Sequence, residues 1–190
     1  MHIQTISGSL RESLRIETRE LHAELESRMA LLDRPLTPQG YIDVLLQLHN
    51  ALSSMVEAWH RSEVEIPWSP DFSDRLRWLE ADLRELGQKP AGNTTAWKGP
   101  SDSLGWWGSF YVYEGSSLGG QFIARALHDS FPNSLNYFSG YGAATGIRWR
   151  NFLMEMENNV RPSEYKDVVA GARLSFQLFL DQAEGKKRAS

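Results

Sequence analysis

Apolar residues recur at helical spacing along most of the chain. Three leucines spaced by seven and four predict a helix over residues 10–29: Leu14, Leu21 and Leu25. A threonine followed by a proline at residues 37–38 is typical of a helix start. The apolar positions after it predict a second helix that continues to about residue 61: Tyr41, Leu45, Leu48, Leu52 and Met55.

Four further helices are predicted downstream. They cover residues 72–86, residues 104 to about 130, residues 147 to about 158, and a last segment that Pro162 can open. The last segment places six apolar residues in or near the core: Val168, Ala172, Leu174, Phe176, Leu178 and Phe179. Convincing period-two alternation is absent, so the predicted fold class is all-α. At 190 residues the chain is expected to form a single domain, with residues 1–9 and 184–190 as flexible tails.

The helix predicted from residue 104 contains an unusual amount of glycine: Gly105, Gly108, Gly115, Gly119 and Gly120. Each interior glycine costs about 1 kcal/mol relative to alanine. Gly108, Gly115 and Gly119 are spaced by seven and four, so they fall on one face of a 3.6-residue helix and form a stripe without side chains. Gly120 widens this stripe. A stripe without side chains permits close packing of two helices. It also permits a flat cofactor to lie against bare backbone, and the stripe alone does not separate these interpretations.

Composition narrows the range of functions. The net charge is −4 and the basic residues are scattered, which disfavours binding to nucleic acid. There is no cysteine, so disulfides, thiolate metal sites and Fe–S clusters are excluded. Glu114, Gln121 and Arg125 interrupt the glycine-rich helix, so no membrane span is expected. No secretory signal is visible at the start, and a cytoplasmic protein is expected.

Among the five histidines, His22 has the most informative neighbour. A histidine that binds a metal usually donates its other ring N–H to a carboxylate or carbonyl, and Glu26 lies one turn further along the predicted helix. A histidine–glutamate pair at this spacing is also common on ordinary helix surfaces. His49 and His60 lie at or near polar helix positions and suggest no chemistry, and His128 is best interpreted as a charge at a helix C-terminus.

Two stretches resemble one known family. Residues 18–26, TRELHAELE, resemble the proximal helix of haem oxygenases, and residues 111–121, YVYEGSSLGGQ, are similar to their distal helix in its bacterial form. The second motif is the more specific of the two. The order and spacing of the helices resemble the family through most of the chain, including LSFQLF at residues 174–179.

The resemblance implies a role for each matching residue. His22 would be the axial ligand of haem iron, oriented by Glu26, and haem would be bound between the first and distal helices. Gly115, Gly119 and Gly120 would bring the distal backbone close to the ring and steer oxygen to one meso carbon. Haem would be both cofactor and substrate, and O2 would convert it to biliverdin, carbon monoxide and ferrous iron.

Cations or hydroxyls are needed to anchor the haem propionates. The resemblance suggests Arg15, Tyr111 and Arg150, although each could be a solvated surface charge or a packed aromatic residue. The chain departs from animal members of the family at Ser116, where those proteins have an aspartate that organises proton-donating waters. Ser116 can still hold water, but the route of proton delivery and the meso carbon that is cut stay unassigned.

The resemblance also implies partners. An external electron donor is expected, either ferredoxin or a flavoprotein reductase, and the product could supply a bilin-binding photoreceptor. Two alternatives remain at this point. One is a haem carrier or sensor that uses His22 as ligand without turnover. The other is a helical interaction protein whose glycine stripe merely packs against a neighbouring helix.

Overall fold

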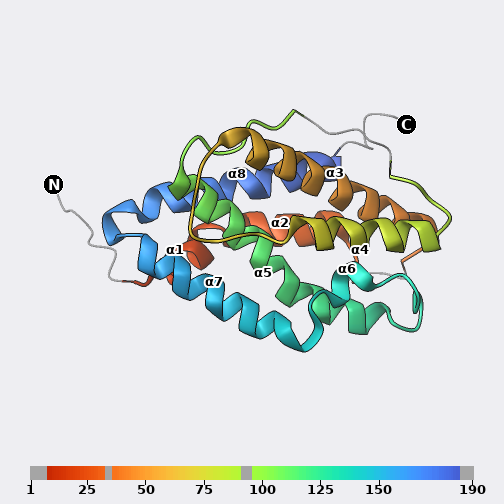
Figure 1. Ribbon diagram of the computed structural model, residues 1–190. Helices are drawn as coiled ribbons and strands as arrows, with labels where there is room; N and C mark the ends of the chain where they lie inside the picture. Colours follow the sequence, from red (N-terminus) through yellow and green to blue (C-terminus); the bar gives the residue numbers. More distant parts are fainter. Residues whose placement is uncertain (1–7, 33–35, 91–95, 185–190) are drawn as a thin grey trace.

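The computed structural model describes residues 8–32, 36–90 and 96–184, and these residues form helices and connecting segments without a strand. The all-α prediction is therefore confirmed (Figure 1). The elements are α1 (Leu10–Glu17), α2 (Arg19–Met29), α3 (Pro38–Ser62), α4 (Phe72–Glu85), α5 (Ser103–Leu127), α6 (Asn136–Ser139), the 3-10 turn η1 (Gly142–Ala144), α7 (Thr145–Asn159), the 3-10 turn η2 (Pro162–Glu164) and α8 (Tyr165–Glu184). The tails expected at 1–9 and 184–190 lie almost wholly outside the described residues.

Helix α5 runs through the middle of the molecule, with α8 and α3 on one side and α7 on the other (Figure 1). Its N-terminal half packs closely against α8. A Cβ added at Gly108 would lie 1.9 Å from the Val168 carbonyl oxygen, and one added at Gly171 would lie 1.9 Å from the Gly105 carbonyl oxygen. The helix-packing interpretation of the glycine stripe is therefore right for this half of α5, and Gly108 does not face a cofactor.

The core is built from all the long helices and is rich in aromatic residues. The largest fully buried side chains include Trp106, Trp107, Phe110, Tyr113, Tyr41 and Phe152. All five apolar residues predicted on the inner face of α3 are buried. The prediction for Leu174 is wrong, because this side chain is 40% exposed.

The single helix predicted over 10–29 is found as two helices separated at Thr18. Its hydroxyl donates to the Leu14 carbonyl at 2.7 Å, and its backbone has φ −109° and ψ 0°. Threonine hydroxyls that bond the preceding turn commonly bend helices. The bend gives the two halves different surroundings: α1 buries Leu10 and Leu14, whereas α2 buries no residue.

His49 was expected at a polar position, but it is buried between α3 and α4. Its Nε2 lies 3.6 Å from Glu80 Oε1, and burial lowers its pKa while Glu80 acts in the opposite direction. The leucine pattern on α3 is broad enough to include this position in the buried face.

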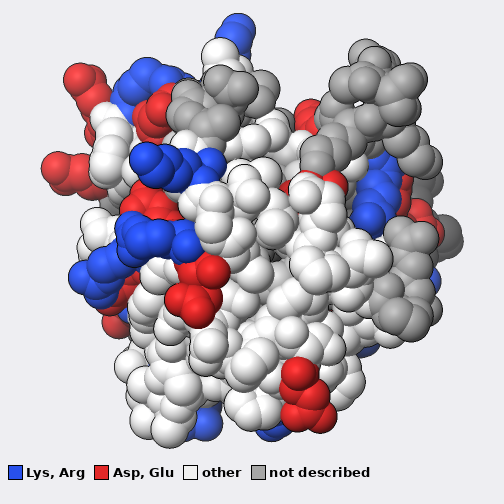
Figure 2. Space-filling view, turned by 90° about the vertical axis from the view of Figure 1, so that its right-hand side faces the viewer, with Lys and Arg blue, Asp and Glu red and all other residues white. Residues whose placement is uncertain are grey.

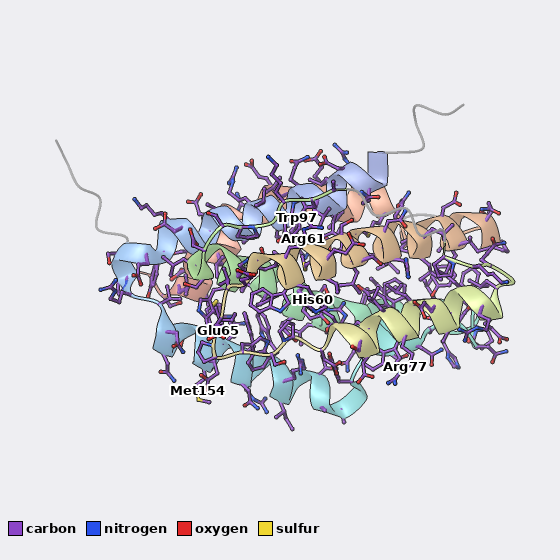
Figure 3. The ribbon with its side chains drawn as sticks, turned by 45° about the horizontal axis from the view of Figure 1, so that its top comes forward. His60, Arg61, Glu65, Arg77, Trp97 and Met154 are labelled. Carbon is purple, nitrogen blue, oxygen red and sulfur yellow. The ribbon has the colours of Figure 1, made fainter. Side chains whose placement is uncertain are left out.

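Two further features concern the surface. At the end of α3, Arg61 Nη2 donates to the Trp97 carbonyl at 2.9 Å and ties the segment before α5 to this helix (Figure 3). On the face shown in Figure 2, basic and acidic side chains lie close together on the left, and the middle of the face is largely uncharged. Among the described residues, none of the helices combines the length and apolar character needed to cross a bilayer.

Candidate functional site

A cavity of about 340 Å³ is lined by residues of α1, α2, α3, α5, α6, α7 and α8. Its walls are mostly aliphatic and aromatic, with a few polar groups, which is typical of a small-molecule site. The residues that matter for the argument are His22, Leu25 and Met29 from α2, Tyr111, Gly115 and Ser116 from α5, Trp149 from α7, and Phe176 from α8. The sequence predicts four of these as site residues.

Helix α2 forms one wall of this cavity. It packs chiefly against α8, and on its inner face Leu25 and Met29 contact the core and also line the cavity. None of its residues is fully buried. His22 and Leu25 therefore face a space that a ligand can fill. Apolar side chains that are left half-buried at a cavity gain further burial when a ligand enters.

His22 has the surroundings of a ligand to iron. Its Nδ1 lies 3.5 Å from Glu26 Oε2, and its ring meets the Phe176 ring edge-on, with centroids 5.9 Å apart. No hydrogen bond among the described residues uses the other ring nitrogen, Nε2. The structure therefore contains the histidine–carboxylate pair predicted from the sequence. The pair is also open to solvent, since the His22 side chain is 59% exposed.

The glycines of the distal motif have three different environments. Gly115 lines the cavity, and a Cβ there would meet Trp149 at an ordinary 3.4 Å. Gly119 faces open space, with nothing within 4 Å of an added Cβ. Gly120 corrects the prediction: a Cβ there would lie 2.9 Å from the Phe138 carbonyl oxygen, so this glycine packs against α6 and does not line the cavity.

The predicted propionate anchors are only partly brought together. Arg15 and Tyr111 line the cavity, but Arg150 is exposed on α7 outside its lining, so that assignment is not supported. The sequence interpretation missed Arg11, which also lines the cavity. Its position one turn before Arg15, on the same helix face, is the signal that could have identified it. Burial raises the pKa of Tyr111, and the positive charges of Arg11 and Arg15 oppose that rise.

Ser116 is held by a residue that the sequence interpretation did not identify. Its hydroxyl donates to the Tyr113 carbonyl at 2.7 Å and accepts from Arg75 Nη2 at 2.8 Å. Arg75 comes from α4 and is 2% exposed. The same Nη2 donates to the Tyr137 hydroxyl at 2.7 Å. A buried guanidinium thus connects two cavity-lining residues from α5 and α6.

The residues present fit a planar, largely apolar ligand with one metal atom and acidic substituents. The apolar walls suit the ring, and the free Nε2 of His22 suits the metal. Gly115 leaves the α5 wall without a side chain, and Arg11 and Arg15 suit carboxylates. Haem is a ligand with all of these features.

Comparisons with known proteins agree with this geometry. A scan against protein-family models finds no match. Over 154 residues the chain is 32% identical to a protein of Xanthomonas campestris pv. campestris (strain 8004) named "Heme oxygenase", which covers 74% of this chain and 90% of the relative. The fold is similar to that of a heme oxygenase from Neisseria meningitidis solved with NO and CO bound, with a TM-score of 0.66 and 17% identity over 93% of this chain and 90% of the other. With the helical fold and the cavity between α2 and α5, the first of these matches shows that the chain belongs to the haem oxygenase family.

Proposed function

We propose that the chain opens the haem ring oxidatively, with O2 as co-substrate, and yields biliverdin, carbon monoxide and ferrous iron. One observation carries the proposal: His22 and Gly115 line the same apolar cavity from two different helices. This arrangement would place a metal ligand on one wall and bare backbone on another. When bound, haem would supply both the iron that activates dioxygen and the ring that is oxidised.

The chain's own residues would position this substrate. His22 Nε2 would ligate the iron, while Glu26, 3.5 Å from Nδ1, would fix the tautomer and ring orientation of the imidazole. Arg11 and Arg15 would bind the propionates, and Tyr111 would border them. Phe176 and Trp149 would cover the ring and exclude water.

Helix α5 would control access to the ring. Gly115 would let the ring approach the helix backbone, and Gly119, one turn further along, faces open space and could do the same. Ser116 would present a hydroxyl oxygen whose position is fixed by Arg75 and by the Tyr113 carbonyl. A fixed set of polar groups beside the reacting atoms costs no reorganisation during the reaction.

Aerobic turnover distinguishes this proposal from a haem carrier or sensor. Haemin-loaded protein is given a reductase or ferredoxin system with O2, and the spectrum is followed. The enzyme predicts that the Soret band fades as a bilin absorption grows, and the bilin isomer then identifies the meso carbon that is cut. Reduction and reoxidation of the haem without bilin would contradict the enzyme and support the carrier.

The proposal extends to partners and organisation. The donor of electrons would be an external ferredoxin or flavoprotein reductase, and the bilin could supply a photoreceptor. We further propose that residues 1–190 act as one domain in the cytoplasm.

A further inference from the structure

We propose that the Tyr137 hydroxyl is the hydrogen-bond donor that this chain directs at a small anion or oxygen ligand bound in the cavity, with Arg75 as the residue that positions it. The inference rests on the proposed haem site and deepens it. It names the residue that donates a hydrogen bond to a ligand in the cavity, a role that the hydrogen bonds of Ser116 leave unfilled.

The Tyr137 hydroxyl already accepts one hydrogen bond, and its own proton is still available to donate one. Its oxygen accepts from Arg75 Nη2 at 2.7 Å. No hydrogen bond among the described residues uses its proton. Tyr137 is a buried residue, 8% exposed, and it lines the cavity. A buried donor without an acceptor costs free energy, and a ligand in the cavity would satisfy it.

Ser116 cannot take the same role with its present hydrogen bonds. Its hydroxyl proton is used by the Tyr113 carbonyl at 2.7 Å, and its oxygen accepts from Arg75 at 2.8 Å. Of the Ser116 and Tyr137 hydroxyls, therefore, that of Tyr137 has a proton free to donate to a ligand. The two hydroxyl oxygens share one guanidinium nitrogen, so the phenol lies beside Ser116 at the cavity.

Arg75 is rigidly held and lies outside the cavity lining. Its Nη1 donates to the Tyr113 carbonyl at 2.5 Å, and its guanidinium lies over the Tyr113 and Tyr137 rings, 4.4 Å and 4.9 Å from their centroids. A charged donor to the phenol oxygen polarises the O–H bond and strengthens the bond that the proton can make.

The backbone of α6 is fixed as well. Asp82, fully buried on α4, accepts from the Asn136 N–H at 2.9 Å, from the Asn136 side-chain amide at 2.7 Å and from the Tyr137 N–H at 2.9 Å. Both ends of Tyr137 are therefore held by α4, its backbone by Asp82 and its hydroxyl by Arg75. Such a donor is oriented before the ligand arrives.

Fluoride is a suitable probe because it binds ferric haem and accepts hydrogen bonds but donates none. Fluoride is titrated into haemin-loaded parent protein and into Tyr137→Phe at one pH. Loss of a hydrogen bond to a charged acceptor predicts fluoride binding weaker by about 10-fold to about 100-fold. Tyr165→Phe, the same chemical change outside this cavity, is the matched control and should bind fluoride as the parent does.

The positioning role of Arg75 has its own test. Arg75→Lys keeps the positive charge but has one side-chain nitrogen in place of the two guanidinium nitrogens that donate here. It should therefore weaken fluoride binding about as much as Tyr137→Phe does. In the Arg75→Lys and Tyr137→Phe double variant the two losses should not add, because Arg75 acts through Tyr137. Additive losses would overturn the positioning role.

The outcomes separate the two levels of the proposal. If the parent gives no Soret band with haemin, the haem site is wrong and this inference is overturned with it. If Tyr137→Phe binds haemin and also fluoride as tightly as the parent, the haem site stands and the donor role is wrong. If Tyr137→Phe binds haemin normally and fluoride weakly, both stand.

Discussion

Arg148 on α7 donates two hydrogen bonds to Glu114 on α5, from Nε to Oε2 at 2.8 Å and from Nη2 to Oε1 at 2.6 Å. The Glu114 residue is 2% exposed, and its Oε1 also accepts from Trp68 Nε1 at 3.0 Å. The acid that interrupts the apolar sequence of α5 is therefore a buried connection. It joins α5, α7 and the segment before α4, and it lies one residue before Gly115.

Removal of one partner of this pair should be strongly destabilising. Glu114→Leu leaves the Arg148 guanidinium half-buried without its carboxylate, and losses of about 3–5 kcal/mol are typical when a buried pair is broken. Urea unfolding followed by circular dichroism measures the change. The Glu114→Leu and Arg148→Met double variant should recover much of the loss, because no unpaired charge remains.

A surface pair provides the comparison. Arg161, whose side chain is 79% exposed, pairs with Glu164 at η2, and Arg161→Gln should change the urea midpoint little, because solvent screens the charge of this arginine. If Glu114→Leu were no more destabilised than Arg161→Gln, the structural role assigned to the buried pair would be wrong.

Substitution of two glycines of α5 by alanine should change the stability of the fold in opposite directions. Gly108→Ala forces a Cβ to within 1.9 Å of the Val168 carbonyl, so α5 and α8 must separate, at a cost of about 1–3 kcal/mol or more. Gly115→Ala makes only an ordinary 3.4 Å contact with Trp149 and gains helix propensity, so the fold should be retained or stabilised by up to about 1 kcal/mol.

A larger substitution at Gly115 should affect haemin binding more than it affects stability. A larger side chain in Gly115→Leu would enter the cavity and weaken haemin binding in a folded protein, which a haemin titration and a thermal melt measure together. Full haemin affinity in Gly115→Leu would show that the ring does not approach α5 at this position.

The arginines at the cavity should matter only for a ligand with carboxylates. Arg11→Gln and Arg15→Gln should each weaken haemin binding, since a hydrogen bond to a charged group is worth about 1.5–3 kcal/mol. Neither should affect haemin dimethyl ester as strongly. Arg150→Gln, with its side chain outside the lining, is the control and should bind both compounds as the parent does. Equal losses for haemin and its ester would rule out propionate anchoring.

Stability should depend on pH through His49. Its pKa in the folded state is lowered below 6.5 by burial, so the unfolded chain binds more protons within the window between the two values. The free energy of unfolding should therefore fall as pH drops through that window, and stay higher above pH 6.5. His49→Gln should remove this part of the pH dependence, whereas exposed His60→Gln should keep it. An unchanged pH profile in His49→Gln would contradict the assignment.

The sequence predicts most helices because helix formation depends on local spacing. Apolar periodicity is sufficient to locate α3, α4 and α5 to within a few residues. His22 and Gly115, which the family resemblance singles out, line one cavity, and Glu26 lies beside His22. The bend at Thr18 was not predicted, because it depends on a side-chain hydrogen bond within an otherwise helical pattern.

The missed features depend on which residues distant in sequence come together. Five glycines on one helix look alike in the sequence, yet Gly108 meets α8, Gly120 meets α6 and Gly115 meets the cavity. Arg75 reads as an ordinary polar position on α4, although it is buried against Tyr113 and Tyr137. The charge of a residue in the sequence does not show whether its guanidinium is buried or solvated. Arg75, which was not predicted at the site, is buried, whereas Arg150, which was predicted there, is exposed.

The central claim is that His22 ligates haem iron, and the absorption spectrum of haemin-loaded protein tests it most directly. The parent should bind one haemin per chain with a sharp Soret band. His22→Ala should lose or shift that band, and added imidazole should restore it by replacing the missing ring. A spectrum of His22→Ala identical to that of the parent, with no response to imidazole, would contradict the account.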